Sequence, residues 1–113
     1  MAAPASSRKI LEKTIENGVL RWLKLQGIRH RKMNGLGNRS WPDQMILIPG
    51  GKPFFIEFKR PGNDLSPLQA DTINYLLSVG YDVEVHTDRA RAISAIEERL
   101  CKADARRTDR RKG

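Results

Sequence analysis

Two short apolar runs decide the fold of this chain: Trp41-Pro42-Asp43-Gln44-Met45-Ile46-Leu47-Ile48 and Phe54-Phe55-Ile56-Glu57-Phe58-Lys59. Both are rich in aromatic and β-branched residues, and the segment Pro49-Gly50-Gly51-Lys52-Pro53 separates them, which predicts two strands joined by a tight turn. Nearly continuous apolarity is typical of a sheet that is covered on both faces. An acid opens the first run, and an acid and a lysine end the second, so the hairpin carries three charges where burial is expected.

The register of this hairpin decides whether Asp43 reaches the other two charges. Alternate residues of a strand share a face, so Glu57 and Lys59 project together while Phe58 packs on the opposite side. A two-residue turn at Gly50-Gly51 would set Asp43 opposite Phe58, whereas a three-residue loop would set it opposite Glu57. We therefore predict the longer loop or a bulge.

Two carboxylates beside a lysine at a strand end form a site for a hard divalent cation. Mg²⁺ prefers a few carboxylate oxygens, with water and substrate phosphate as its other ligands. Such a cation polarises a phosphoryl oxygen and lowers the pKa of a bound water, and Lys59 would orient that water or neutralise charge growing on the phosphorus. A plainer interpretation is that Asp43 caps a turn and that Glu57 pairs with Lys59 as strand-edge charges.

The rest of the chain predicts helices around a small mixed sheet. Hydrophobic spacing and capping residues predict a helix over 7–26, an edge strand over 28–33, hairpin strands over 45–48 and 54–58, a helix over 67–80, a strand over 81–86 and a helix from about 88 to 103. Ser66 suits the N-cap and Pro67 the first position of the second helix. The strand, helix, strand order after residue 54 implies a right-handed crossover to a parallel neighbour, and hence an α/β fold.

Length and charge indicate one small basic domain. The 113 residues allow a single core, which we assign to 7–103, with a flexible start over 1–6 and a basic disordered tail over 104–113. The net charge of +8 favours a nucleic acid or another anionic partner. The single cysteine, Cys101, excludes an internal disulfide and fits a reducing cytoplasm. No apolar stretch is long enough for a membrane span, so no membrane partner is expected.

The motifs of the hairpin resemble a known nuclease signature. Pro42-Asp43 followed by Glu57-Phe58-Lys59 is similar to the PD-(D/E)XK pattern. The longer string from Trp41 to Gln69, with Pro49-Gly50-Gly51, Lys59-Arg60-Pro61-Gly62 and Leu65-Ser66-Pro67-Leu68-Gln69, resembles the VRR-NUC branch, the virus-type replication-repair nucleases. The resemblance extends from about Glu12 to about Thr87. It implies a restriction-endonuclease-like core in which the elements follow the order α-β-β-β-α-β-α.

The resemblance also implies roles for individual residues of the hairpin. Asp43 and Glu57, with the main-chain carbonyl of Phe58, would hold one or two Mg²⁺ or Mn²⁺ ions. Lys59 would position the attacking water. Gln69, in the first turn of the second helix, would position water, metal or phosphate. No small-molecule cofactor is expected.

Nucleases of this kind commonly supply a further acid from the first helix. Glu16 lies where such an acid would approach the strand ends, and Glu12 falls on a position that is often acidic in VRR-NUC sequences, so the choice stays open. Either residue alone also fits a solvated acidic edge. His30 is expected to be a surface or phosphate-contacting residue and not the catalytic base. Four cations are expected to contact DNA phosphates: Arg31, Lys32, Arg39 and Arg60.

Together these features predict a metal-dependent DNA endonuclease that hydrolyses phosphodiester bonds in a bacterial or phage-infected cell. Resemblance to stand-alone VRR-NUC proteins implies branched DNA, such as a four-way junction, cut by a homodimer during replication, repair or recombination. The alternative is a non-catalytic basic DNA-binding module. An RNA-cutting enzyme is a weaker alternative, because no histidine pair is placed for metal-free acid–base cleavage.

Overall fold

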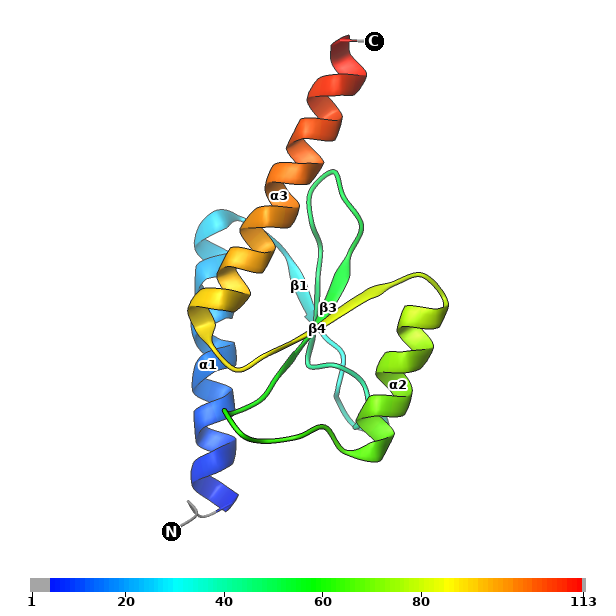
Figure 1. Cartoon of the computed structure of the whole chain (residues 1–113). Helices are drawn as coiled ribbons and strands as arrows, with labels where there is room; N and C mark the ends of the chain where they lie inside the picture. The colour runs from blue at the N-terminus through cyan, green and yellow to red at the C-terminus, as the bar shows by residue number, and fades with distance from the viewer. Residues whose placement is uncertain (1–4, 113) are drawn as a thin grey trace.

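The computed structural model describes the backbone of residues 5–112 and the side chains of residues 11–106. Its elements are α1 (Ala5–Gln26), β1 (His30–Lys32), β2 (Gln44–Ile46), β3 (Phe54–Phe58), α2 (Pro67–Ser78), β4 (Asp82–His86) and α3 (Arg89–Lys112). The sheet has the order β1-β2-β3-β4, in which only the β3–β4 pair is parallel. The predicted α/β fold with a small mixed sheet is therefore confirmed (Figure 1).

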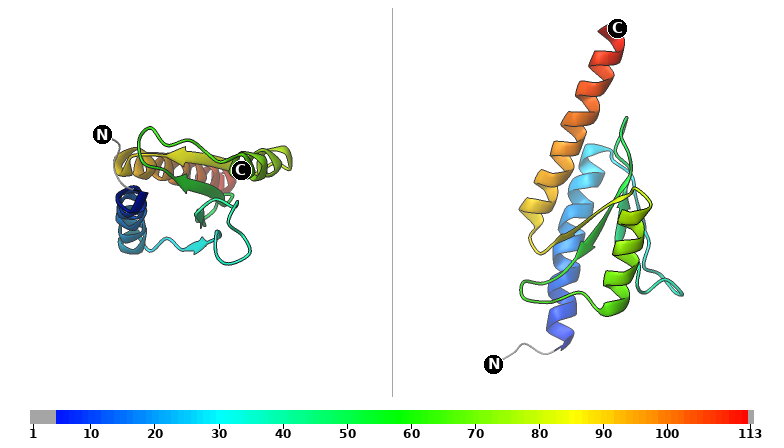
Figure 2. Two further views of the ribbon diagram at one scale, coloured as in Figure 1. Left: turned by 90° about the horizontal axis from the view of Figure 1, so that it is seen from below. Right: turned by 45° about the vertical axis from the view of Figure 1, so that its right-hand side comes forward.

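Helices cover both faces of the sheet. Figures 1 and 2 show α1 and α3 on one side and α2 on the other. On the second face the ring of Phe55 meets those of Trp41 and Tyr81 edge to face. All five residues of β3 are buried, which explains the nearly continuous apolar run. The main core lies on the α1 and α3 side and contains Val19, Leu23, Ile28, Ile46, Ile48, Phe54, Ile56, Phe58, Ala92, Ile96 and Ala103.

The hairpin has the register that the site needs. The paired residues are Gln44 with Ile56, Met45 with Phe55, and Ile46 with Phe54. One step further in the same register, Asp43 lies opposite Glu57. In the connecting segment the Gly51 N–H donates to the Ile48 carbonyl at 3.0 Å, and Gly50 has a φ of 76°, which glycine adopts without strain. The expected longer connection is present.

The first two of the three predicted consecutive strands are shorter than expected. β1 covers residues 30–32 and not 28–33, because Ile28 is buried in the main core and its N–H donates to the Leu23 carbonyl at 3.0 Å, closing the end of α1. β2 covers residues 44–46 and not 45–48, so it starts directly after Asp43. The bounds predicted for β3 are confirmed.

The helices also differ from prediction at their ends. α1 begins at Ala5 and so includes two residues of the segment expected to be flexible, whose residues 1–4 lie outside the described part of the chain. α3 continues to Lys112, where disorder was expected after about Ala103. The added segment is rich in arginine, which is a good helix former, and cations favour a helix C-terminus. No helix of the described chain is both long and apolar enough to cross a membrane.

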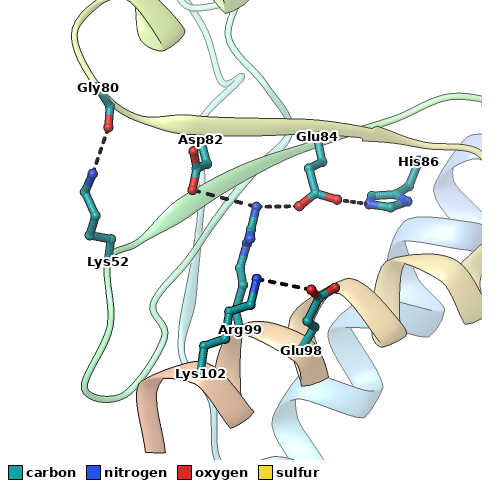
Figure 3. A network of polar contacts seen from close by, with 8 residues as sticks. All are labelled: Lys52, Gly80, Asp82, Glu84, His86, Glu98, Arg99 and Lys102. Atoms are coloured by element: carbon teal, nitrogen blue, oxygen red, sulfur yellow. Dashed lines mark hydrogen bonds and ion pairs between the residues drawn. The ribbon is translucent and has the colours of Figure 1, made fainter. Parts of the chain in front are cut away.

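A polar network fixes α3 against β4 (Figure 3). Arg99 of α3 donates to the carboxylate of Glu84, lies 3.8 Å from that of Asp82, and stands 4.0 Å over the ring of Phe54. Glu84 also meets the Nε2 atom of His86 at 2.9 Å. Arg99 thus combines an ion pair with a cation–π contact in a partly buried position, which stabilises more than an exposed pair.

Arg99→Ala should lower the free energy of unfolding by about 1–3 kcal/mol, because it removes both contacts and leaves the Glu84 carboxylate with His86 alone. The matched control is Lys102→Ala, which breaks only the exposed pair with Glu98 and should change stability by less than about 0.5 kcal/mol. Urea unfolding followed by circular dichroism measures both. Equal losses in the two variants would show that the network does not stabilise α3.

Candidate active site

The open end of the β2–β3 hairpin brings the predicted acids to one place. Asp43 precedes β2, and Glu57 lies near the end of β3. Helix α1 adds two more acids, so the site draws on the first helix, the edge strand and both hairpin strands. A pocket of about 180 Å³ opens there, and it is lined by Glu12, Lys13, Glu16, Lys32, Asp43 and Phe58.

Hydrogen bonds hold Asp43 in one orientation. Its Oδ2 atom accepts the backbone N–H of Phe58 at 2.7 Å, and its Oδ1 atom accepts the side-chain amide of Asn34. The backbone carbonyl of Asp43 accepts the N–H of Met33 at 3.0 Å. The carboxylate is therefore fixed at the end of β3 before any ligand arrives.

Glu57 is the most strongly perturbed acid of the site. It is 2% exposed, and its Oε2 atom is buried without a hydrogen-bond partner. Burial, a hydrogen bond to Asp43 and the negative charge of Asp43 raise the pKa of Glu57 from 4.5 to about 9, against the opposing charge of Lys59. The metal-free site therefore keeps a proton on Glu57 at neutral pH. A divalent cation between the two acids would remove the need for that proton.

Helix α1 supplies two acids that have different partners. Glu16 is buried, and its Oε2 atom accepts the amide of Gln44 at 2.7 Å; the Oε1 atom of Gln44 lies 3.0 Å from Nδ1 of His30. Glu12 is half-buried and accepts the amide of Asn63 at 2.8 Å. Both acids line the pocket, so the structure brings both to the site.

Lys59 lies beside the acids, directly after β3. It is 9% exposed, and its backbone N–H donates to the carbonyl of His86 at 3.0 Å, which extends the β3–β4 pairing by one residue. Its positive charge acts on Glu57. Lys59 is therefore a buried lysine next to the acids and not a solvated edge charge, and its role in the reaction stays a prediction.

Gln69 has a structural role that was not predicted from the sequence. It forms a capping box with Ser66: the Ser66 N–H donates to Oε1 of Gln69 at 2.9 Å, and Ser66 Oγ accepts the Gln69 N–H at 3.1 Å. The spacing Ser-x-x-Gln before an apolar run is a signal of this motif. The predicted N-cap at Ser66 is thus confirmed. Gln69 does not line the acidic pocket described above, and its role in the reaction stays a prediction.

The four predicted phosphate-binding cations differ in position and exposure. Lys32 lines it, Arg31 is exposed on β1, and Arg39 is exposed in the loop that follows β1. Arg60 is half-buried, and its N–H donates to Glu12 at 3.3 Å. Lys13 was assigned no role in the site from the sequence, but it lines the pocket. Its position between Glu12 and Glu16 in the sequence could have indicated this.

The donor set fits a divalent cation that keeps several outside ligands. Among the described residues, no three acidic, histidine or cysteine side chains form a ready-made metal cage. Mg²⁺ requires fewer protein side chains than such a cage provides, since it is bound by one or two carboxylates together with water and phosphate. Asp43 and the unpartnered oxygen of Glu57 provide that pair. Glu16 would join them only by leaving Gln44.

Comparison with known proteins places this geometry in a family. The VRR-NUC domain matches residues 2–90, which is most of the chain. The chain belongs to the VRR-NUC family. A similar protein is "Putative nuclease p44" of Acyrthosiphon pisum secondary endosymbiont phage 1, with 33% identity over 79 residues that cover 69% of this chain and 84% of that protein. The resemblance seen in the motifs is confirmed, and this VRR-NUC chain is a nuclease domain, which implies DNA as its substrate.

The raised pKa of Glu57 predicts how the stability of the chelated protein depends on pH. Between pH 4.5 and about 9 the folded state holds a proton that the unfolded state has released, so the free energy of unfolding falls as pH rises through this range. Glu57→Gln carries no ionisable group there and should flatten the dependence. Urea unfolding in EDTA at pH 5, 7 and 9 measures both proteins. Parallel pH profiles for wild type and variant would rule out the raised pKa.

Proposed function

We propose that this VRR-NUC protein is a Mg²⁺- or Mn²⁺-dependent DNA endonuclease that hydrolyses phosphodiester bonds. The observation that carries the proposal is the facing of Asp43 and Glu57 at the buried end of the hairpin, with Lys59 beside them. Four acids at one site repel DNA unless a cation compensates for them, although the chain as a whole is basic. A module that only binds DNA has no use for this arrangement.

Each residue of the site has a task in the proposed reaction. When bound, the metal supplies Lewis-acid polarisation of the phosphoryl oxygen and activation of water. Asp43, Glu57 and the Phe58 carbonyl would hold it, with Glu16 or Glu12 as the helix acid. Lys59 would orient the attacking water and neutralise charge that develops on the phosphate. Asp43 needs little reorganisation, because the backbone of β3 already fixes its carboxylate.

The DNA that we propose as substrate is branched, such as a four-way junction, bound by a homodimer. The exposed cations Arg31, Lys32 and Arg39, of which Lys32 lines the pocket, would contact phosphates, which gives affinity without sequence preference. Two copies related by a two-fold axis would present two active sites to a substrate of matching symmetry. Replication, repair and recombination in a bacterial or phage-infected cell all present such DNA.

A cleavage assay tests the function. Labelled four-way junction, flap and linear duplex DNA should be cut in Mg²⁺ or Mn²⁺ and left intact in EDTA. Lys59→Ala should lower the rate by about 10²–10⁴-fold, because the water loses its positioning group. Asp43→Asn should abolish cutting and keep or improve DNA binding, because it removes a negative charge. Lys52→Ala, an exposed lysine at the other end of β3, is the matched control and should cut like the wild type.

Two outcomes would contradict the proposal. Binding of all these DNAs without any cleavage would favour the non-catalytic module. Cleavage that survives EDTA would show that the acids at Asp43 and Glu57 do not act through a metal.

Gln69→Glu separates capping from a role in the reaction. Glutamate at this position also completes a capping box, so the free energy of unfolding should stay within about 0.5 kcal/mol of the wild type. Cleavage should fall, because the carboxylate cannot donate a hydrogen bond to water or phosphate as the amide does. Wild-type cleavage by this variant would limit Gln69 to its capping box. Urea unfolding and the junction assay provide the two measurements.

A further inference from the structure

A second and larger groove lies beside the acidic pocket, between α1 and the edge strand β1. Its volume is about 650 Å³. Leu20 and Ile28 give it an apolar floor, and Arg21, Lys24, Arg29 and His30 line it with polar and charged atoms. The two arginines and the lysine are exposed, and no ion pair among residues 11–106 involves them. Their charge is therefore available to an anionic ligand.

Both walls of the groove continue the walls of the acidic pocket. On α1, Lys13 lines the pocket and Asn17 lines the groove one turn later, followed by Arg21 on the same side of the helix. On β1, Lys32 lines the pocket, and His30, two residues earlier and hence on the same face, lines the groove. The pocket and the groove therefore follow one another along α1 and β1, and we call the two together the track.

A hydrogen-bond chain through the buried side chain of Gln44 joins the two parts of this track. His30 of the groove lies 3.0 Å from the amide oxygen of Gln44, and the amide nitrogen of Gln44 donates to Glu16 of the pocket at 2.7 Å. Gln44 is 2% exposed, so this chain is a fixed part of the floor. A ligand in the groove would thus lie directly next to the acids.

The track, pocket and groove together, has a length and polarity that suit a nucleic-acid backbone. From Lys13 to Lys24 the helix rises roughly 16 Å at 1.5 Å per residue, which corresponds to about four or five nucleotides at 3.4 Å of rise each. Cations at the edges suit phosphates, and the apolar floor suits the sugars between them. Side-chain contacts to phosphates position DNA without reading its sequence.

We propose that the groove between α1 and β1 binds the DNA strand that leaves the active site, with Arg21, Lys24 and Arg29 on phosphates next to the cleaved bond. This proposal rests on the proposed nuclease function and gives the substrate its path. The cations offset the repulsion between DNA and the acids, and they hold the scissile phosphate over Asp43 and Glu57.

Salt-dependent binding tests the groove without requiring cleavage. Fluorescein-labelled four-way junction is titrated in EDTA with Asp43→Asn protein and with the same protein carrying Arg21→Ala and Lys24→Ala. The two groove substitutions should weaken binding about tenfold or more and reduce the slope of log K against log salt by about two, since two phosphate contacts are lost. The matched control is Lys102→Ala with Arg106→Ala, which removes the same charge from the cleft at the other end of the sheet. Equal losses of DNA affinity in both pairs of variants would overturn the proposed DNA-binding role of the groove.

A cross-linking experiment tests where the strand lies. Lys24→Cys is made in a Cys101→Ser background, since Cys101 is the chain's exposed free thiol. A junction carries a disulfide-activated tether at single phosphates. Cross-links should form within about five nucleotides of the cleaved bond, which is the span of the track from Lys13 to Lys24 at 3.4 Å per nucleotide, and Lys102→Cys should not form them there. Cross-links that are confined to distant positions, or equal for the two variants, would overturn the proposed path.

Cleavage by the wild type is scored separately, so that the two proposals can fail independently. If the wild type cuts DNA and the groove variants bind and cut as well as it does, the proposed DNA-binding role of the groove is wrong and the proposed nuclease function stands. Groove-dependent binding by a protein that never cuts would overturn the nuclease and leave the groove as a DNA-binding site.

Discussion

Asp43 and Glu57 face each other across the end of the β2–β3 hairpin, and the rest of the structure keeps them there. A shift of the pairing by one residue would turn Glu57 to the other face of the sheet. The main core prevents it, because Phe54, Ile56 and Phe58 fill the side of α1 and α3 while Phe55 is packed on the other side. The hydrogen bond from the Phe58 N–H to Asp43 then joins the acid to the strand that carries its partner.

This arrangement sets the electrostatics of the whole site. Two acids in one buried place cannot both carry a charge without compensation, and burial together with Asp43 raises the pKa of Glu57 to about 9. Lys59 opposes the rise but does not cancel it. The site is therefore stable when protonated or when it holds a cation. In the proposed reaction the cation-bound state would act at neutral pH, and the cations of α1 and β1 would provide the positive surroundings that a DNA substrate needs next to four acids.

Much of the fold could be predicted because local signals agree with it. The bounds of β3 and the cap at Ser66 follow from apolar runs and capping residues. The ends of β1 and α3 could not be predicted in the same way. Ile28 leaves the strand because the core takes it, and the end of α3 continues through residues that have little apolar surface to bury. For β1 the missing information was tertiary packing. For α3 the helix propensity of the residues mattered more than their lack of apolar side chains.

The active site likewise has parts that could be predicted from the sequence and parts that could not. The meeting of Asp43 and Glu57 follows from the period of a strand and from the length of its turn, both of which are local. The hydrogen bond between Glu16 and Gln44 joins residues that are 28 positions apart. The spacing of residues within α1 therefore could not predict it. The hydrophobic periodicity of α1 predicts that Arg21 and Lys24 lie on its solvent-exposed face. This face lines a groove only because the β1 segment packs beside it.

The position of a bound Mn²⁺ ion tests the role of the acid pair most directly. Crystals of the protein soaked in MnCl₂ would locate the ion by its anomalous scattering. The ion should lie between a carboxylate oxygen of Asp43 and the Oε2 atom of Glu57, at about 2.0–2.3 Å from each, and its peak should vanish in Asp43→Asn crystals. An ion bound elsewhere, with this pair still sharing its proton at saturating Mn²⁺, would contradict a metal-dependent site.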